Sequence, residues 1–213
     1  MQKKNKFYAL NLILVSLLLA IFFAVLILVV TKHDFKIDLF NAEVVKLRNP
    51  FFNKFFEYFS LIGNFYFLLI LIVSLVLLVW LKFKKKFIAL FIALSFAFVA
   101  VVNFLIKNLV KRTRPEQFML FEEFSYSFPS WHTMLTMFVF GVLIYFTYKF
   151  IKKKPLKIVL ISIFSLIIVL MAFARVYLGV HYVSDVVAAI ALGLTCVILF
   201  VVIYTRYFAI KKD

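Results

Sequence analysis

Six apolar runs, each long enough to cross a lipid bilayer, constrain the fold more than any other feature of the sequence. A spanning helix needs about 20 consecutive apolar residues, and backbone groups inside a bilayer must bond to one another, which favours helices. We therefore predict an all-α, polytopic membrane protein with six transmembrane helices. The predicted spans are about residues 7–30, 61–81, 87–106, 132–150, 157–174 and 185–205.

The composition excludes a soluble domain. Hydrophobic residues make up 66% of the 213 residues, and the mean hydropathy is +1.10, far above ordinary soluble domains. We expect residues 1–213 to form one integral membrane domain. The net charge of +16 does not indicate nucleic-acid binding, because the lysines lie in short clusters between the runs, where anionic headgroups account for them.

Two stretches between the runs are not predicted to span. Residues 31–57 mix charged residues with a Phe-rich stretch, which is typical of an interfacial amphipathic segment, and residues 107–130 form a polar loop. The first run is read as a retained span rather than a signal peptide, because no small-residue cleavage site follows it. Cys196 is the one cysteine, so no intrachain disulfide can form.

The distribution of charge predicts the orientation. Six spans place both termini on one side, and if that side is the cytoplasm, 15 of the 25 Lys and Arg residues are cytoplasmic, as the positive-inside rule favours. Every acid except Asp213 falls on the other side. We predict a multi-pass plasma-membrane protein with cytoplasmic termini. Loop 107–130 and residues 175–185 then share the extracytoplasmic face, as a candidate active site.

The first polar cluster at this face is basic and lies where the third run ends. A basic flank can simply anchor a helix to headgroups, but these cations lie on the side that the positive-inside rule disfavours. An anionic substrate is another reason for such a cluster. Its members are Lys107, Lys111, Arg112 and Arg114, followed by Pro115.

The second cluster opens the fourth run with residues 127–132, Ser-Phe-Pro-Ser-Trp-His. Ser130 is a good N-cap, and a helix N-terminus offers free N–H groups and a partial positive charge that suit a phosphate. The alternative is a plain cap followed by interfacial Trp131 and His132, which are common at membrane boundaries.

The third cluster lies between the fifth and sixth runs and contains Arg175, His181 and Asp185. On a helix, His181 and Asp185 would share one face, so that the carboxylate reaches the imidazole and leaves the other ring nitrogen free as a base or nucleophile. The Arg175 guanidinium suits phosphate oxygens. The alternative is a polar cluster that only solvates a membrane boundary.

Together the clusters resemble the three motifs of the type 2 phosphatidic acid phosphatase superfamily, K-x6-R-P, P-S-G-H and S-R-x5-H-x3-D. The matching residues are Lys107, Arg114 and Pro115, then Pro129, Ser130 and His132, then Arg175, His181 and Asp185. The six spans also fit. Trp131 replaces the usual glycine and Ala174 the frequent serine. We expect Trp131 to be the first residue of a helix, where any side chain fits, rather than a strained residue at positive φ.

The resemblance implies a phosphatase that works through a phosphohistidine. His181 would attack phosphorus, Asp185 would orient it, and His132 would protonate the leaving oxygen and then activate water. The phosphate oxygens would be held by Lys107, Arg114, Ser130, the Trp131 N–H and Arg175. The sequence has no carboxylate cluster for Mg²⁺ and no Cys/His cluster for Zn²⁺, so we expect no metal and no cofactor.

The implied substrate is a lipid phosphate or diphosphate whose tail stays in the bilayer. Undecaprenyl diphosphate, phosphatidic acid and phosphatidylglycerol phosphate all fit, and an outward-facing site favours the first by family analogy. One alternative is a lipid phosphotransferase that uses the same histidine. Another is a catalytically weak lipid-binding or transport protein, which Trp131 would explain. The membrane composition argues against the vanadate-dependent halide oxidation of soluble relatives.

Overall fold

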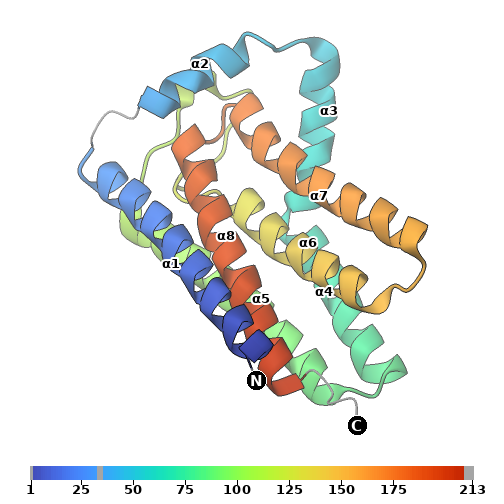
Figure 1. Cartoon of the computed structure of the whole chain (residues 1–213). Coiled ribbons are helices and arrows are strands. Elements are labelled where there is room, and N and C mark those ends of the chain that lie inside the picture. The colour runs from blue at the N-terminus through green and yellow to red at the C-terminus, as the bar shows by residue number, and fades with distance from the viewer. Residues whose placement is uncertain (1, 33–35, 209–213) are drawn as a thin grey trace.

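The computed structural model describes residues 2–32 and 36–208, and these residues form an all-α bundle (Figure 1). Six of its helices are long and apolar enough to cross a membrane, as predicted. They are α1 (Gln2–Val30), α4 (Phe65–Leu77) with its π-helical continuation η3 (Leu78–Lys82), α5 (Lys86–Val110), α6 (Trp131–Phe150), α7 (Lys154–Tyr177), and α8 (Val183–Ile203) with its π-helical continuation η5 (Tyr204–Phe208).

Three helix ends differ from the predicted spans in ways that matter for the site. Helix α5 continues past residue 106, so that Lys107 lies in its last turn. Helix α7 ends at Tyr177, which places Arg175 in its last turn. Helix α4 begins only at Phe65, because residues 61–63 form a 3₁₀ turn (η2, Leu61–Gly63) and the Asn64 side chain caps α4 by accepting a hydrogen bond of 2.9 Å from Tyr66 N.

The segment between the first two spans folds into three short helices. These are the 3₁₀ helix η1 (Lys36–Leu39), α2 (Phe40–Val45) and α3 (Pro50–Ser60). Residues 33–35 of the predicted interfacial segment lie outside the described residues, as does the tail at 209–213. In Figure 1, α2 lies across the end of the bundle opposite the end where α1 begins and η5 ends, and α3 runs down from there beside α7.

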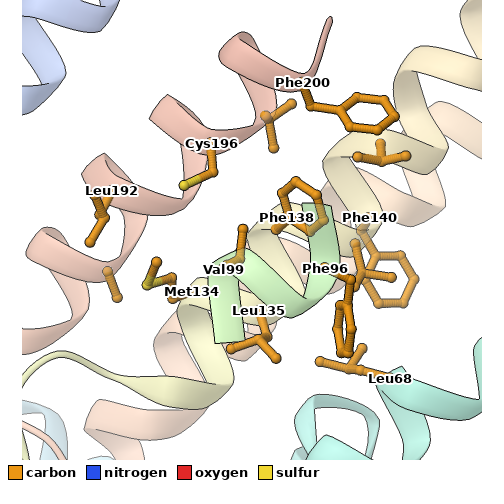
Figure 2. Close-up of a cluster of buried hydrophobic side chains, with 14 of the residues drawn as sticks. Leu68, Phe96, Val99, Met134, Leu135, Phe138, Phe140, Leu192, Cys196 and Phe200 are labelled. Carbon is orange, nitrogen blue, oxygen red and sulfur yellow. The ribbon is translucent and has the colours of Figure 1, made fainter. Parts of the chain in front are cut away.

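The three polar clusters lie at the end that α2 covers, which we call the site end. Helix α6 packs against both α7 and α8, and α1 packs along α8. Figure 2 shows the apolar core to which α4, α5, α6 and α8 contribute, with Met134 and Phe138 of α6 near Cys196 and Phe200 of α8. This packing fixes the N-termini of α6 and α8, which carry His132 and Asp185.

Two glycines let α6 and α8 approach each other closely. A Cβ atom on Gly141 would lie 2.6 Å from Val197 Cγ2, and one on Gly193 would lie 3.0 Å from the Met134 carbonyl oxygen. Small residues serve the same purpose at many contacts between membrane helices. The close contact makes the α6–α8 pair a rigid base for the site end.

The turn between α7 and α8 depends on Gly179, which has φ +72°. A Cβ atom there would lie 1.8 Å from the Phe118 carbonyl oxygen. The left-handed conformation alone costs an L-residue about 1–2 kcal/mol, and the clash adds to this. Gly179→Ala is therefore expected to lower the thermal unfolding midpoint of the detergent-solubilised protein by about 5 °C or more. An unchanged midpoint would show that the turn can rearrange freely.

Candidate active site

The His181 imidazole lies at the site end between a carboxylate and a guanidinium, and it is only 1% exposed. Its Nδ1 is 3.5 Å from Asp185 Oδ2, and its Nε2 is 3.5 Å from Arg114 Nη1. Burial lowers the pKa of His181 well below its ordinary value, and the positive charges of Arg114 and Lys107 lower it further. The ring is therefore neutral at pH 7, which is the state that a nucleophile requires.

The contact between His181 and Asp185 does not form on one helical face, and that part of the prediction is wrong. Helix α7 ends at Tyr177 and α8 begins at Val183, so His181 lies in the turn between them. The positive φ of Gly179 breaks the helix before His181 is reached. Asp185, in the first turn of α8, points back over this turn and accepts a hydrogen bond of 3.0 Å from Tyr182 N.

Two more side chains hold the Asp185 carboxylate, which is fully buried. The Ser127 hydroxyl donates to Asp185 Oδ2 and also lies 3.4 Å from His181 Nδ1. On the other side, Arg112 Nη1 donates to Asp185 Oδ1 at 2.6 Å, while Arg112 Nη2 donates to Asp38 Oδ2 at 2.8 Å. Arg112 thus pairs with two carboxylates in the structure. From the sequence it was grouped with the cations expected to bind an anionic substrate.

The three cations expected to hold phosphate are all buried at the site end. Exposed fractions are 6% for Lys107, 8% for Arg114 and 1% for Arg175. Arg114 is fixed by bonds of 2.6 Å to the carbonyl oxygens of Val180 and Ser125. Arg114, a predicted phosphate ligand, thus lies directly next to Nε2 of the candidate nucleophile.

Lys107 and Arg175 both contact residues of the loop that follows Pro115. Lys107 Nζ donates to the Tyr126 carbonyl oxygen. Arg175 Nη2 lies 3.1 Å from Glu123 Oε1, and the other carboxylate oxygen of Glu123 is 3.6 Å from Arg114 Nη2. Arg175 Nη1 donates to Ser60 Oγ at 3.1 Å, whereas the buried Nε has no partner within the described part of the chain.

The second cluster joins the third through a backbone hydrogen bond of 3.3 Å from Ser130 N to the Asp185 carbonyl oxygen. Ser130 is the N-cap of α6, and its hydroxyl accepts from Thr133 N at 3.4 Å. His132 lies in the first turn of α6, half-buried and beside Gly63. Among the described residues its side chain makes no hydrogen bond, so the ring is available to a ligand.

Trp131 is the first residue of α6 and is not among the described residues with positive φ. Its indole packs against Phe65 of α4, with ring centroids 5.8 Å apart. Replacing the usual glycine therefore causes no backbone strain, and the large side chain fills space between α6 and α4 while its N–H stays in the first turn of the helix.

No role at the site was predicted for residues between the first two spans, yet several of them form hydrogen bonds with the turn that carries His181 and with the start of α8. The fully buried Asn41 donates from Nδ2 to the His181 carbonyl oxygen at 2.8 Å and accepts from Val183 N at 3.2 Å. Asp38 accepts from Ser184 N at 2.9 Å. In the sequence, these two residues stand out only as an acid and an amide among apolar neighbours.

Within residues 2–32 and 36–208, no group of three or more His, Cys, Asp and Glu side chains is placed to hold a metal ion. Beside the neutral imidazole, the site holds the carboxylates of Asp185 and Glu123 and the three cations Lys107, Arg114 and Arg175. Such a set can bind an anion with several oxygens and present a nitrogen to its central atom.

The family model of the PAP2 superfamily matches residues 88–209, which include all three clusters. The chain belongs to the PAP2 superfamily. Phosphatidylglycerophosphatase B of Bacillus subtilis (strain 168) is 34% identical to this PAP2 protein over 157 residues, which are 72% of this chain and 76% of that protein.

Two solved structures share the fold of this PAP2 protein. The crystal structure of a transmembrane PAP2 type phosphatidylglycerolphosphate phosphatase from Bacillus subtilis has a TM-score of 0.80 and 29% identity, covering 91% of this chain and 98% of that one. Aquifex aeolicus LpxE has a TM-score of 0.63 and 26% identity, covering 79% and 96%. The chain is thus a membrane lipid phosphatase.

Proposed function

We propose that this PAP2 phosphatase hydrolyses a lipid phosphate without a metal ion, through a phosphohistidine on His181. The observation that carries the proposal is the orientation of the ring, with Nδ1 toward Asp185 and Nε2 3.5 Å from Arg114 Nη1. A phosphoryl group bound to Arg114 would take the place of Nε2 as the partner of that guanidinium and would lie next to the Nε2 lone pair. Such proximity supplies a large part of the rate in reactions of bound groups.

The reaction has two steps. His181 Nε2 forms a bond to phosphorus, and the bond from phosphorus to the lipid oxygen breaks while protonated His132 donates its proton to that oxygen. Neutral His132 then takes a proton from water, the hydroxide attacks phosphorus, and the N–P bond returns its electron pair to Nε2. Asp185 stabilises the positive charge that the His181 ring carries in the intermediate.

The cations supply the electrostatic stabilisation that a metal gives in other phosphatases. Lys107, Arg114 and Arg175 face the non-bridging oxygens, on which negative charge accumulates in the transition state. Ser130 and the first amides of α6, including that of Trp131, complete the oxygen contacts at the helix N-terminus.

Phosphatidylglycerol phosphate is the first substrate we propose, because relatives that cover most of the chain are named for it. This choice replaces undecaprenyl diphosphate, which the sequence alone favoured; that lipid and phosphatidic acid remain the comparison substrates.

We also propose that the whole chain is one integral domain of the plasma membrane, with both termini in the cytoplasm and the active site outside. In support, the site end lies opposite the end where α1 begins and η5 ends (Figure 1), and the Lys and Arg residues are more numerous on the side of the termini. The lipid tail then stays in the bilayer while the phosphate enters the site.

Purified, detergent-solubilised protein is expected to release inorganic phosphate from phosphatidylglycerol phosphate at the same rate with and without EDTA. Phosphatidic acid and undecaprenyl diphosphate are compared at equal mole fractions in the micelle. Activity that disappears in EDTA and returns with Mg²⁺ or Zn²⁺ would overturn the metal-independent reaction. A new phosphate ester formed with an added alcohol, in place of inorganic phosphate, would identify a phosphotransferase.

A further inference from the structure

The carboxylate of Glu123 occupies the place between two of the proposed phosphate-binding arginines. One oxygen lies 3.1 Å from Arg175 Nη2 and the other lies 3.6 Å from Arg114 Nη2. The arginine side chains are 1% and 6% exposed, whereas the Glu123 side chain is 26% exposed. Glu123 thus reaches from the surface toward two buried cations and neutralises part of their charge.

The Glu123 carboxylate does not accept from all the hydrogen-bond donors that surround it. Arg175 Nε is buried and has no hydrogen-bond partner in the described part of the chain. A buried N–H without an acceptor is costly, and a carboxylate has two oxygens where a phosphate has three or more. The site therefore offers more donors than Glu123 fills, and a phosphate group satisfies them better.

The loop that carries Glu123 is anchored by hydrogen bonds on both sides of residues 121–124. Leu120 N donates to the Leu178 carbonyl oxygen at 3.1 Å, and Ser127 N donates to the Arg112 carbonyl oxygen at 2.8 Å. Arg114 and Lys107 donate to the carbonyl oxygens of Ser125 and Tyr126, whereas residues 121–124 form no backbone hydrogen bond within the described residues. Glu123 also lines an open hollow of about 600 Å³ beside the loop, so the carboxylate can turn to solvent without breaking a helix.

We propose that Glu123 is an internal competitor of phosphate, bound to Arg175 and Arg114 in the empty enzyme, displaced by the lipid phosphate, and returning as inorganic phosphate leaves. The proposal rests on the phosphate-binding role of these arginines in the proposed function. Three buried cations would hold the phosphate product tightly, and the carboxylate speeds product release by replacing it. Removing this competitor should strengthen phosphate binding by roughly tenfold if the carboxylate occupies the arginines about nine-tenths of the time, because the apparent affinity is reduced in proportion to the fraction of enzyme that is open to phosphate.

Glu123→Gln tests the proposal because it removes the charge and keeps the size. The KM for dioctanoyl phosphatidic acid in detergent micelles and the Ki of inorganic phosphate should both fall by roughly tenfold, while kcat stays equal or falls. Glu123→Asp keeps the charge, and both constants should lie between those of the other two proteins. Glu122→Gln is the matched control, since Glu122 is an exposed neighbour and forms no ion pair among the described residues.

Three results would overturn the proposal. A higher KM and Ki in Glu123→Gln would mean that the carboxylate positions the arginines for phosphate. Unchanged constants would mean that it does not compete, and an equal fall in Glu122→Gln would mean that only the overall charge matters. Calorimetric titration of each protein with inorganic phosphate measures the exchange without turnover, so the competitor is tested even if the wild type hydrolyses none of the three lipids, which would count against the proposed function instead.

Discussion

His181→Ala is expected to reduce phosphate release by on the order of 10⁴-fold or more, which is the scale seen when a covalent nucleophile is removed. No other described nitrogen takes the place of Nε2, which lies 3.5 Å from Arg114 Nη1 while Asp185 holds the opposite side of the ring. Alanine removes the attacking atom and leaves the phosphate-binding cations in place. The variant should therefore still bind inorganic phosphate in a calorimetric titration while turnover is lost.

The covalent step is checked by acid- and base-quenching the wild-type enzyme after mixing it with lipid labelled in the phosphate. Label that stays on the protein at high pH and is lost at low pH is the behaviour expected of a phosphohistidine. His33, the third histidine, lies outside the three motifs, so His33→Ala serves as a control with near-normal turnover. Normal turnover in purified His181→Ala would rule out the mechanism.

Arg112→Met is expected to lower both stability and kcat, because it leaves the fully buried Asp185 without its cation. Breaking a buried ion pair by removing one partner typically costs 3–5 kcal/mol. Arg112 donates to Asp185 Oδ1 at 2.6 Å and to Asp38 Oδ2 at 2.8 Å, so two carboxylates lose a donor together. We expect a fall in the unfolding midpoint of about 10 °C and a loss in kcat of at least about 100-fold as His181 loses its orientation.

Lys111→Met is the matched control for this prediction. Lys111 is the adjacent residue, carries the same charge and is exposed, without an ion pair in the described part of the chain. Its variant should keep the wild-type midpoint and kcat. If Arg112→Met instead weakened phosphate binding and left kcat and the midpoint unchanged, Arg112 would be a phosphate ligand, as the basic cluster in the sequence first suggested.

The six spans and the residues of the three clusters could be predicted because each depends on a local pattern. Apolar runs of bilayer length give helices, and the spacing of Lys107, Arg114, His181 and Asp185 is a property of short stretches. The N-cap role of Ser130 also follows from its place before an apolar run. These features do not depend on which distant segment lies nearby.

What the sequence could not supply is the pairing of polar groups across the chain. Arg112 is bonded to Asp38 and Asp185, which are 74 and 73 positions away in the sequence. Asn41 is bonded to the carbonyl oxygen of His181, 140 positions away. No periodicity connects such residues. The prediction that His181 and Asp185 share a helical face was wrong for a local reason. Gly179 ends the helix, and α8 starts only after His181.

The hydrogen bonds of Asn41 also indicate the order in which parts of the enzyme fold. Asn41 bridges the turn just before α8, contacting positions 140 and 142 residues later in the chain. During synthesis this amide is made long before its partners exist, and contacts of such sequence separation form late. The catalytic centre therefore closes only when the last helix has joined the bundle, and a nascent chain that stops before α8 has neither Asp185 nor the turn anchored by Asn41.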